Sequence, residues 1–505
     1  MTSSFNTTPP LKVALVWPGG VFGAEGNFGV PQILSLAAAL QRIGLASITV
    51  FDLDAERALG GFSPEAFGNA GYDIVAISCY SSYDYLKVMA LAAWLRPFAP
   101  GAWFVVGGYH PSACPEDFQV DHSPFDYVVV GEGEQALVDL LGMRHASITP
   151  DSRTILGGAT DLRTTIPYPF ELLERYRPVV ARVANRFELY LSRGCPYGCS
   201  FCMEQSKRNV AWRALSVEEA IDQIVRLDRT FGLSGRALRI TDALFGMNRA
   251  WRREFLECLA QRPCAAEKIW LLTRGDLLER EDFRLMARAN VALGFGLESG
   301  DPELLRSTGK LRGNVEQFLE KLFDIAEWSR EFQVPFGTNV IVGLPGETST
   351  SLERTARYLD RLFLSELPTI GFFGIDRFRL YPGSAISQQL ERWHNQTGFV
   401  AHRQRWWFDG DQDFLSEWND PSSDLDYEQA MQRSFELFAP RLAALRQRFA
   451  YQGPARDRFE ATIDENLASW APAARHRQAE LEELWRPLKG TSGELLEPIA
   501  LFARQ

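Results

Sequence analysis

The sequence has no apolar run long enough to cross a bilayer, which takes about 20 residues in a helix. It also lacks an excess of positive charge. The formal net charge of −11 disfavours a nucleic-acid backbone as a partner. Residues 1–10 are polar and lack the basic-then-apolar layout of a signal peptide. We therefore expect a cytoplasmic protein with no membrane span and no nucleic acid bound.

Cysteine is scarce, and its 7 copies are an odd number with three of them clustered. This pattern fits metal ligation in a reducing compartment better than a disulfide framework. We expect the four isolated cysteines, Cys79, Cys114, Cys258 and Cys264, to be buried small apolar side chains. With 505 residues the chain is too long for one compact core, which predicts roughly two to four domains.

The clustered cysteines are Cys195, Cys199 and Cys202, in the stretch CPYGCSFC that follows an apolar run at 187–191. Proline and glycine between them prevent a regular helix and allow a tight loop in which the sulfurs converge. A four-iron cluster normally takes four thiolates, so three leave one iron open for chemistry. The alternatives are a structural zinc loop and three unrelated buried cysteines. Zinc needs a fourth ligand close by, and the next histidine after Cys202 is His394.

This CxxxCxxC loop is similar to the cluster loop of the radical SAM superfamily. The resemblance implies a [4Fe–4S] cluster on the three cysteines, with the open iron binding the amino and carboxylate groups of S-adenosylmethionine (SAM). It also implies that one electron from the cluster cleaves SAM to methionine and a 5′-deoxyadenosyl radical. Phe201 stands where the family carries an aromatic residue that borders the adenine.

The N-terminal third alternates strand and helix patterns. Short apolar runs occupy 11–17, 47–51, 73–78, 103–106 and 126–130, and a helical pattern begins at Pro31 and stops at Gly44. This predicts an α/β domain with a doubly wound, Rossmann-like parallel sheet and a ligand at the carboxyl ends of its strands. The glycine-rich loop from Gly19 to Gly29 does not match G-x-G-x-x-G, which disfavours a dinucleotide. A generic nucleotide-binding domain remains the plain alternative.

Ser78-Cys79-Tyr80, followed by Gly107-Gly108, is similar to the Ser-x-Leu…Gly-Gly spacing of cobalamin-binding domains, with tyrosine in place of leucine. The resemblance implies that the serine contacts the benzimidazole tail and that the glycines let the backbone approach it. The family's Asp-x-His-x-x-Gly, which supplies a histidine to cobalt, is absent from 31–36. Either no cobalamin binds, or it binds without a protein histidine on cobalt, as in many members of the cobalamin-dependent radical SAM branch.

The segments 107–111 and 131–134 also look like that branch. The resemblance implies cobalamin contacts from Ser78, Tyr80, Ser81, Ser82, Gly107, Gly108, His110, Glu132 and Gly133. For His110, a contact with the corrin or its tail and a hydrogen-bonded loop histidine are the two alternatives.

Residues 148–185 have poor periodicity and contain Pro167 and Pro169, which predicts a linker. A second strand–helix alternation follows, with strands expected at 187–191, 238–242, 269–274, 292–298, 337–343 and 378–383. Six such units predict a partial (β/α)6 barrel with its site at the carboxyl ends of the strands. Ser216 is expected to cap the first helix of this domain.

Polar residues at these strand ends match SAM-binding positions of the radical SAM family. The resemblance implies contacts from Phe201, Asp242, Arg274, Glu298, Asn339, Arg379 and Tyr381. Arg274 suits the SAM carboxylate because a guanidinium binds carboxylates bidentately, and Asn339 suits the ribose. Any one of them is equally well a satisfied strand-end polar group. The stretch NVIVGLPGET at 339–348 supports the family on its own.

After residue 386 the chain is helix-like and rich in aromatic residues. The apolar spacing over 429–449 predicts an amphipathic helix. We expect a helical cap whose aromatic residues are core, and a role in lining the substrate pocket is a compatible alternative. The predicted domains are 1–147 for cobalamin, 148–185 as linker, 186–386 as the radical SAM barrel and 387–505 as the helical cap.

Together the resemblances cover 11–382 and imply a cobalamin-dependent radical SAM enzyme, most often a C-methyltransferase at an unactivated carbon of a small molecule. The implied mechanism uses one SAM to form methylcobalamin and a second as the source of the radical. A flavodoxin or ferredoxin is the implied electron donor. Radical cyclisation or rearrangement with the same cofactors, and a non-catalytic cobalamin-binding sensor, remain alternatives.

Overall fold

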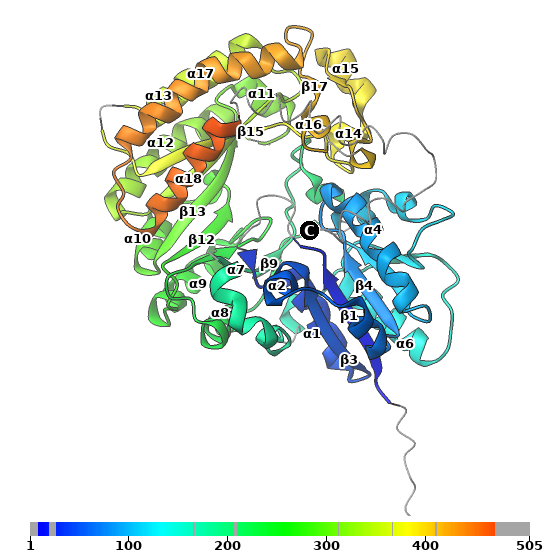
Figure 1. Cartoon of the computed structure of the whole chain (residues 1–505). Helices are drawn as coiled ribbons and strands as arrows, with labels where there is room; N and C mark the ends of the chain where they lie inside the picture. The colour runs from blue at the N-terminus through cyan, green and yellow to red at the C-terminus, as the bar shows by residue number, and fades with distance from the viewer. Residues whose placement is uncertain are drawn as a thin grey trace, which may run out of the picture. The chain divides into compact units, whose positions relative to one another are not determined.

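The computed structural model describes residues 9–19, 27–164, 167–184, 186–206, 210–311, 313–365, 367–409 and 412–469. Residues 1–8, most of the glycine-rich loop after the first strand and the end of the predicted cap lie outside these ranges. The chain divides into two compact units, the first formed mainly by residues 1–188 and the second by 189–205 and 210–492 (Figure 1). No helix in the described part of the chain combines the length and apolar character needed to span a membrane.

The first unit is built on a parallel sheet with strand order β3-β1-β4-β5-β6-β7. Its strands are β1 (Leu11–Trp17), β3 (Ala46–Asp52), β4 (Ile74–Ser78), β5 (Trp103–Gly107), β6 (Tyr127–Val130) and β7 (Thr154–Leu156). The predicted doubly wound α/β fold is therefore confirmed. β7, which pairs with β6, is a sixth strand within the segment predicted as a linker.

Helices flank this sheet: α1 (Pro31–Ile43), α2 (Leu53–Leu59), α3 (Pro64–Ala70), α4 (Tyr85–Leu95), α5 (Tyr109–Ala113), α6 (Gly133–His145) and α7 (Arg177–Val183). α1 follows its sequence signals. Proline occupies its first turn, Gly44 closes it in the left-handed conformation at φ 70°, and Ile33, Leu34 and Leu40 are buried. α1 and α6 lie side by side (Figure 1).

The end of the first unit is tied to its sheet by Tyr176, which is 0% exposed. Its hydroxyl accepts a hydrogen bond from the N–H of Asp52 at 3.0 Å and donates to Glu56 Oε1 at 2.5 Å. The short strand β2 (Asn27–Phe28) pairs in parallel with the start of β8 (Arg186–Leu189), the strand at whose end the second unit begins.

The second unit is built on a sheet in which β15, β14, β13, β12, β11 and β8 follow one another. The strands from β11 onward are parallel and are β11 (Ala237–Ile240), β12 (Lys268–Thr273), β13 (Val291–Glu298), β14 (Phe336–Val342) and β15 (Gly371–Arg377). Between them run α8 (Val217–Phe231), α9 (Arg249–Gln261), α10 (Arg280–Arg288), α11 (Pro302–Ser307), α12 (Val315–Phe332) and α13 (Ser349–Phe363). Ser216 caps α8 as predicted, its Oγ accepting from the N–H of Glu219 at 3.2 Å.

The position predicted for the last strand, 378–383, is wrong. The strand is β15, which ends at Arg377, and the predicted residues form the loop that follows it. The reason is chemical, because Pro382 has no N–H for a ladder, whereas Gly371 to Ile375 are all buried. The error moves Arg379 and Tyr381 from a strand to a loop at its carboxyl end.

The two faces of this sheet differ. On one, Phe295 stacks on Phe336, which packs against Phe363 of α13, so the helices cover this face with aromatic core. On the other, Gly296, Asn339 and Gly374 are in register across β13, β14 and β15. Two glycines beside a solvent-exposed asparagine leave this row almost without side chains.

The C-terminal part is helical, as predicted, with α14 (Ala385–Gln388), α15 (Leu390–Thr397), α16 (Gln412–Glu417), α17 (Tyr427–Arg448) and α18 (Pro454–Ser469). α17 is the expected amphipathic helix. α18 runs along β15, where its Asn466 Oδ1 accepts from the N–H of Ile375 at 2.5 Å. Because β15 is an edge strand, α18 covers backbone groups that would otherwise be open to pairing with another chain.

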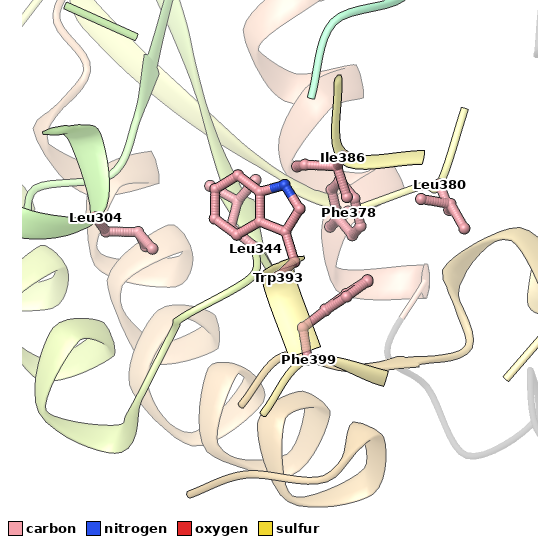
Figure 2. Packing of buried hydrophobic residues seen from close by; sticks show 7 residues of the cluster. All are labelled: Leu304, Leu344, Phe378, Leu380, Ile386, Trp393 and Phe399. Atoms are coloured by element: carbon pink, nitrogen blue, oxygen red, sulfur yellow. The ribbon is translucent and has the colours of Figure 1, made fainter. Parts of the chain in front are cut away.

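A hydrophobic cluster joins this helical part to the barrel (Figure 2). It consists of Leu304, Leu344, Phe378, Leu380, Ile386, Trp393 and Phe399. Trp393, Trp406 and Trp407 are all buried, as expected for core, whereas Phe408 and Trp418 are exposed. Full burial of a large apolar side chain is worth roughly 1.5–3 kcal/mol, so the cluster holds the loop after β15 firmly in place.

Of the four isolated cysteines, Cys79 alone is buried as expected. Cys114, Cys258 and Cys264 are half-buried. The cysteines of the described chain are all free.

Candidate active site

The chain enters the cysteine loop through a fixed turn. Asp242, at the end of β11, accepts hydrogen bonds from the N–H of Leu191 at 2.8 Å and from Ser192 Oγ at 2.5 Å. Burial raises the pKa of this carboxyl to about 6, and the hydrogen bonds oppose that rise. Gly194 follows at φ 83°, with a Cβ position only 2.2 Å from the carbonyl oxygen of Ala211. The predicted SAM residue Asp242 therefore orients the start of the loop.

The middle of the loop lies against two other segments. The N–H of Ser200 donates to the carbonyl of Thr308 at 2.8 Å, and its carbonyl accepts from the N–H of Ile386 at 3.0 Å. A Cβ on Gly309 would lie 3.1 Å from the carbonyl oxygen of Gly198. The neighbouring Phe201 packs against the hydrophobic cluster of Figure 2. The cysteines therefore sit on a loop whose backbone and aromatic anchor are both fixed.

The three thiols share one surrounding. Cys199 is buried, and Cys195 and Cys202 are half-buried. Burial is the main cause that raises the pKa of each thiol, to about 12 for Cys202, and the charge of Cys199 adds to the rise at the other two. A bound metal reverses the preference for the protonated thiol, because its charge stabilises the thiolate.

The donor set fits a cluster better than a single ion. Within the described ranges, no three His, Cys, Asp or Glu side chains converge closely enough to hold one metal ion, as a zinc site requires. A four-iron cluster spreads its thiolates over separate irons and needs no such convergence. Three sulfurs on one constrained loop can each bind a different iron of one cluster.

Arg274, predicted to pair with SAM, has its guanidinium already engaged. Nε and Nη2 bond to the carboxylate of Asp276 at 2.9 and 3.0 Å, and Nη2 also donates to the carbonyl of Lys310 at 3.0 Å. The guanidinium carbon lies 3.7 Å from the ring centroid of Tyr197, inside the cysteine loop. Arg274 thus ties the loop to the end of β12.

Glu298 forms a buried ion pair that the sequence did not reveal. Its Oε1 lies 2.8 Å from Nζ of Lys310, and both side chains are less than a tenth exposed. Glu298 adopts φ 68°, unusual for a residue with a side chain. A Cβ on Gly296 would lie 1.9 Å from Glu298 Oε1, so glycine is required beneath the pair. Lys310 was missed because its spacing from the cysteines carries no signal.

The other predicted SAM residues gather near Asp376, which was also missed. Asn339 Nδ2 donates to Asp376 Oδ2 at 2.7 Å. Desolvation by the surrounding protein is the main cause that raises the pKa of Asp376. The charge of Arg379 lowers this pKa, and the charge of Glu298 raises it. Arg379 itself pairs with Glu417 at 2.6 Å. Tyr381, whose pKa burial raises to about 12, turns its ring edge toward Trp406.

In the first unit, the predicted cobalamin residues lie at the carboxyl ends of β4 and β5. Ser78 and Gly107 are in register across these strands. Gly108 has φ 133°, and a Cβ there would lie 2.2 Å from the carbonyl oxygen of Cys79. The two loops therefore touch through their backbones, which only glycine permits.

His110 lies beneath this edge and is 0% exposed. Its Nδ1 is 2.8 Å from Ser82 Oγ, and its Nε2 is 3.3 Å from Asp117 Oδ2. Ser82 and Asp117 are also buried. These contacts describe a buried histidine in α5 that is hydrogen-bonded to Ser82, an arrangement that favours the second of the two alternatives.

The rim of the same edge is aromatic. Trp17, Tyr80 and Tyr109, from the ends of β1, β4 and β5, meet in edge-to-face contacts with centroids 6.0 and 5.3 Å apart. Ser81 closes a capping box with Asp84. A half-buried aromatic rim with no side chain on Gly107 suits a large flat ligand, and cobalamin is such a ligand.

Glu132 precedes Gly133, the first residue of α6, and contacts the segment that follows β7. Glu132 Oε2 accepts from the N–H of Thr160 at 2.8 Å, and a Cβ on Gly157 would lie 1.9 Å from the Glu132 carbonyl. Thr160 and Gly157, which follow β7, therefore hold the backbone at Glu132 in place.

Two family models match separate parts of the chain. The model of the radical SAM superfamily matches residues 189–359, and that of the B12 binding domain matches residues 25–141. An uncharacterized methyltransferase from Pyrococcus horikoshii is 25% identical over 70% of this chain and 78% of its own length. The hopanoid C-3 methylase of Methylococcus capsulatus is 26% identical over 67% of this chain and 63% of its own.

The cobalamin-dependent radical SAM methyltransferase TokK from Streptomyces tokunonensis is 24% identical over 55% of the chain, which spans 43% of that protein. Among solved structures, the cobalamin-dependent SAM radical enzyme OxsB gives a TM-score of 0.66 at 15% identity, covering 94% of this chain and 75% of that one. The radical SAM methyltransferase TsrM from Kitasatospora setae gives 0.60 at 18% identity, covering 77% of each.

The matched segments coincide with the two units. The B12 model falls on the sheet that carries Gly107 and Gly108, and the radical SAM model begins six residues before Cys195. The predicted cofactors are confirmed at the level of the domains: SAM and a [4Fe–4S] cluster in the second unit, cobalamin in the first. The chain therefore combines a B12 binding domain with a radical SAM domain, and its relatives include named cobalamin-dependent radical SAM methyltransferases.

Proposed function

We propose that the protein is a C-methyltransferase that acts at an unactivated carbon of a small molecule. The observation that carries the proposal is the presence of both matched domains in one chain, one with an edge suited to cobalamin and one with a three-thiol loop. Its relatives include methylases of hopanoids and the methyltransferase TokK.

We assign the cluster to Cys195, Cys199 and Cys202. We assign SAM to the predicted residues of the second unit other than Arg274, and cobalamin to the predicted residues of the first unit other than the buried His110. When bound, these groups supply the electron that cleaves SAM and the carrier of the methyl group. The chain's own residues do the positioning. Asp242 and Arg274 fix the cysteine loop, and Phe201 with its apolar neighbours keeps water from one side of it.

In the first unit, the assigned residues act through shape. Gly108 lets the loops after β4 and β5 close against each other, and His110 stiffens them from below through Ser82 and Asp117. The buried histidine leaves cobalt without a protein imidazole in this arrangement, in accord with the missing Asp-x-His-x-x-Gly. The aromatic rim then supplies contact area rather than a ligand.

The free cysteines fit a reducing cytoplasm, where a flavodoxin or ferredoxin serves as electron donor. Cyclisation is the competing function, because two anaerobic magnesium-protoporphyrin IX monomethyl ester cyclases match 40% and 66% of this chain. The two functions differ in what becomes of the methyl group of SAM.

The test is an anaerobic incubation of protein reconstituted with iron, sulfide and cobalamin. It receives a reductant, SAM labelled with CD3 and the small-molecule extract of the organism that carries the gene. Methyl transfer predicts a product with the CD3 label, with 5′-deoxyadenosine and S-adenosylhomocysteine formed together. Cyclisation predicts 5′-deoxyadenosine without S-adenosylhomocysteine. Protein that retains no corrin after desalting contradicts the proposal.

A further inference from the structure

Ser200 lies between Cys199 and Phe201 in the cysteine loop and carries a buried hydroxyl. The residue is 8% exposed, and its Oγ has no hydrogen-bond partner among the residues that the structure describes. We infer that this hydroxyl donates a hydrogen bond to a sulfur of the bound cluster and so raises the cluster's reduction potential. The inference rests on the proposed function, since it requires a cluster on the loop.

The backbone of Ser200 is held from two sides. Its N–H donates to the carbonyl of Thr308 at 2.8 Å, and its carbonyl accepts from the N–H of Ile386 at 3.0 Å. These bonds fix the backbone, so only rotation of the side chain can bring the hydroxyl to an acceptor. A buried hydroxyl that stays unbonded costs free energy, so its position implies an acceptor that arrives with a ligand.

Among the groups next to this hydroxyl, the sulfur of Cys199 becomes a strong acceptor when metal binds. Phe201, on the other side, packs against the hydrophobic cluster of Figure 2. The hydroxyl of Thr308 donates to the carbonyl of Leu304 at 2.8 Å. Cys199 is 9% exposed, so its sulfur and the neighbouring hydroxyl have little access to water. On iron, the Cys199 thiol becomes a thiolate, which is an anionic acceptor.

The other two cysteines already accept hydrogen bonds from the loop. The N–H of Glu204 donates to Cys202 Sγ at 3.4 Å, and the N–H of Tyr197 donates to Cys195 Sγ. Hydrogen bonds to the sulfurs are one of the factors that set the potential of a cluster. The reduced cluster carries one more negative charge than the oxidised cluster. A hydrogen bond from Ser200 therefore stabilises the reduced form more and raises the potential.

The test is a redox titration of the cluster, followed by electron paramagnetic resonance. It uses the full-length protein, reconstituted anaerobically with iron and sulfide and without SAM. In Ser200→Ala, we expect the ratio of reduced to oxidised cluster at a fixed potential to fall about tenfold, because the reduced form loses a charge-assisted hydrogen bond. For a one-electron couple, this change corresponds to a midpoint potential about 59 mV lower. Ser200→Thr keeps a hydroxyl donor, so its ratio should stay within about twofold of the wild type.

Ser307→Ala is the matched control. Ser307 lies in the adjacent segment at an exposed position, and its hydroxyl donates to the carbonyl of Leu304 at 3.0 Å. Its removal should leave the midpoint potential unchanged. Electron–nuclear double resonance of the reduced cluster gives a second readout. The wild type and Ser200→Thr should show an exchangeable proton coupling that disappears in D2O, and Ser200→Ala should lack it.

Three results overturn the inference. One is an equal midpoint potential in the wild type and Ser200→Ala. Another is an equal shift in Ser200→Ala and Ser200→Thr, which would reflect packing. The third is a shift that occurs only after SAM is added, which would place the hydroxyl against SAM.

A midpoint potential does not depend on how much of the protein is loaded, so the comparison holds for a variant that binds less iron. Wild-type protein that holds no iron–sulfur cluster contradicts the proposed function itself. The role of Ser200 is decided only by protein that carries the cluster.

Discussion

The two cofactor sites that we assign to this chain differ in how they are built. Around the cysteine loop, the second unit gathers charges and pairs each one: Arg274 with Asp276, and Lys310 with Glu298. At the edge of the first unit, the assigned positions other than Glu132 are neutral or aromatic, and His110 is buried beneath them. The site at the cysteine loop depends on individual sulfur atoms and charged groups. The site at the edge of the first unit depends on the path of the backbone.

The difference follows from what each site holds. A cluster takes covalent ligands from the chain, and SAM is charged, so cysteines and ion pairs are required. A corrin without a protein ligand offers no such bonds, so the protein must provide surface and close backbone approach. We therefore expect that removal of one sulfur from the loop abolishes cluster binding. At the edge, we expect that addition of one methyl group weakens cobalamin binding.

The largest effect is expected for Cys199→Ala, which removes one of three iron ligands. We expect the variant to lose the iron–sulfur cluster and all formation of 5′-deoxyadenosine from SAM. Iron content and the visible spectrum after anaerobic reconstitution measure the loss of the cluster. Chromatography of the quenched reaction measures the loss of 5′-deoxyadenosine. Cys258→Ala, which lies on α9, is the control and should keep both. Cleavage of SAM by Cys199→Ala at the parent rate would show that the cluster assignment is wrong.

The next effect is expected for Gly108→Ala at the edge. The added methyl would lie 2.2 Å from the carbonyl oxygen of Cys79, on a backbone at φ 133° that alanine rarely adopts. We expect cobalamin retention to fall at least about tenfold, because the strain of 1–3 kcal/mol alone is of that order. The same change at Gly142 meets no atom within 4 Å and should have no effect. Equal retention in both variants contradicts the role of the backbone contact.

The sequence predicted the fold and the loop well, because both depend on local patterns. Apolar runs placed the parallel strands within one or two residues, and the cysteine spacing pointed to the loop to which we assign the cluster. The residues that it missed depend on long-range contacts: Lys310, Asp376 and the burial of His110 involve residues distant in sequence. The error at β15 was local, because the apolar run at 371–375 competes with a second apolar segment that contains Pro382.

A smaller effect is expected for His110→Phe, which tests whether the histidine supports the edge or ligates cobalt. Loss of a buried hydrogen-bonded network should lower the free energy of unfolding by about 1–3 kcal/mol. The electron paramagnetic resonance spectrum of bound cob(II)alamin should be unchanged, since the ring faces Ser82 and Asp117. His122→Phe, at an exposed position, is the control for stability. Loss of nitrogen splitting in His110→Phe would instead identify the histidine as a ligand.

The smallest effect concerns Glu347, which is buried and accepts from the N–H of Gly343 at 2.5 Å after β14. Burial raises the pKa of this carboxyl to about 8. The folded state therefore binds the proton more tightly than the unfolded state, so stability falls as pH rises from about 4.5 to 8. Relative to Glu347→Gln, the wild type should lose about 2 kcal/mol between pH 6 and 8 in denaturant titrations. Parallel stability curves would contradict a buried protonated carboxyl at Glu347.

The central claim is that the loop carries a cluster with one iron open to SAM. The most direct measurement is the electron paramagnetic resonance spectrum of the reduced, oxygen-free protein before and after SAM is added. Our account predicts a [4Fe–4S]⁺ signal that changes on addition of SAM, followed by 5′-deoxyadenosine in the quenched sample. A protein that holds zinc in place of iron, or a cluster signal that SAM leaves unaltered, would contradict it.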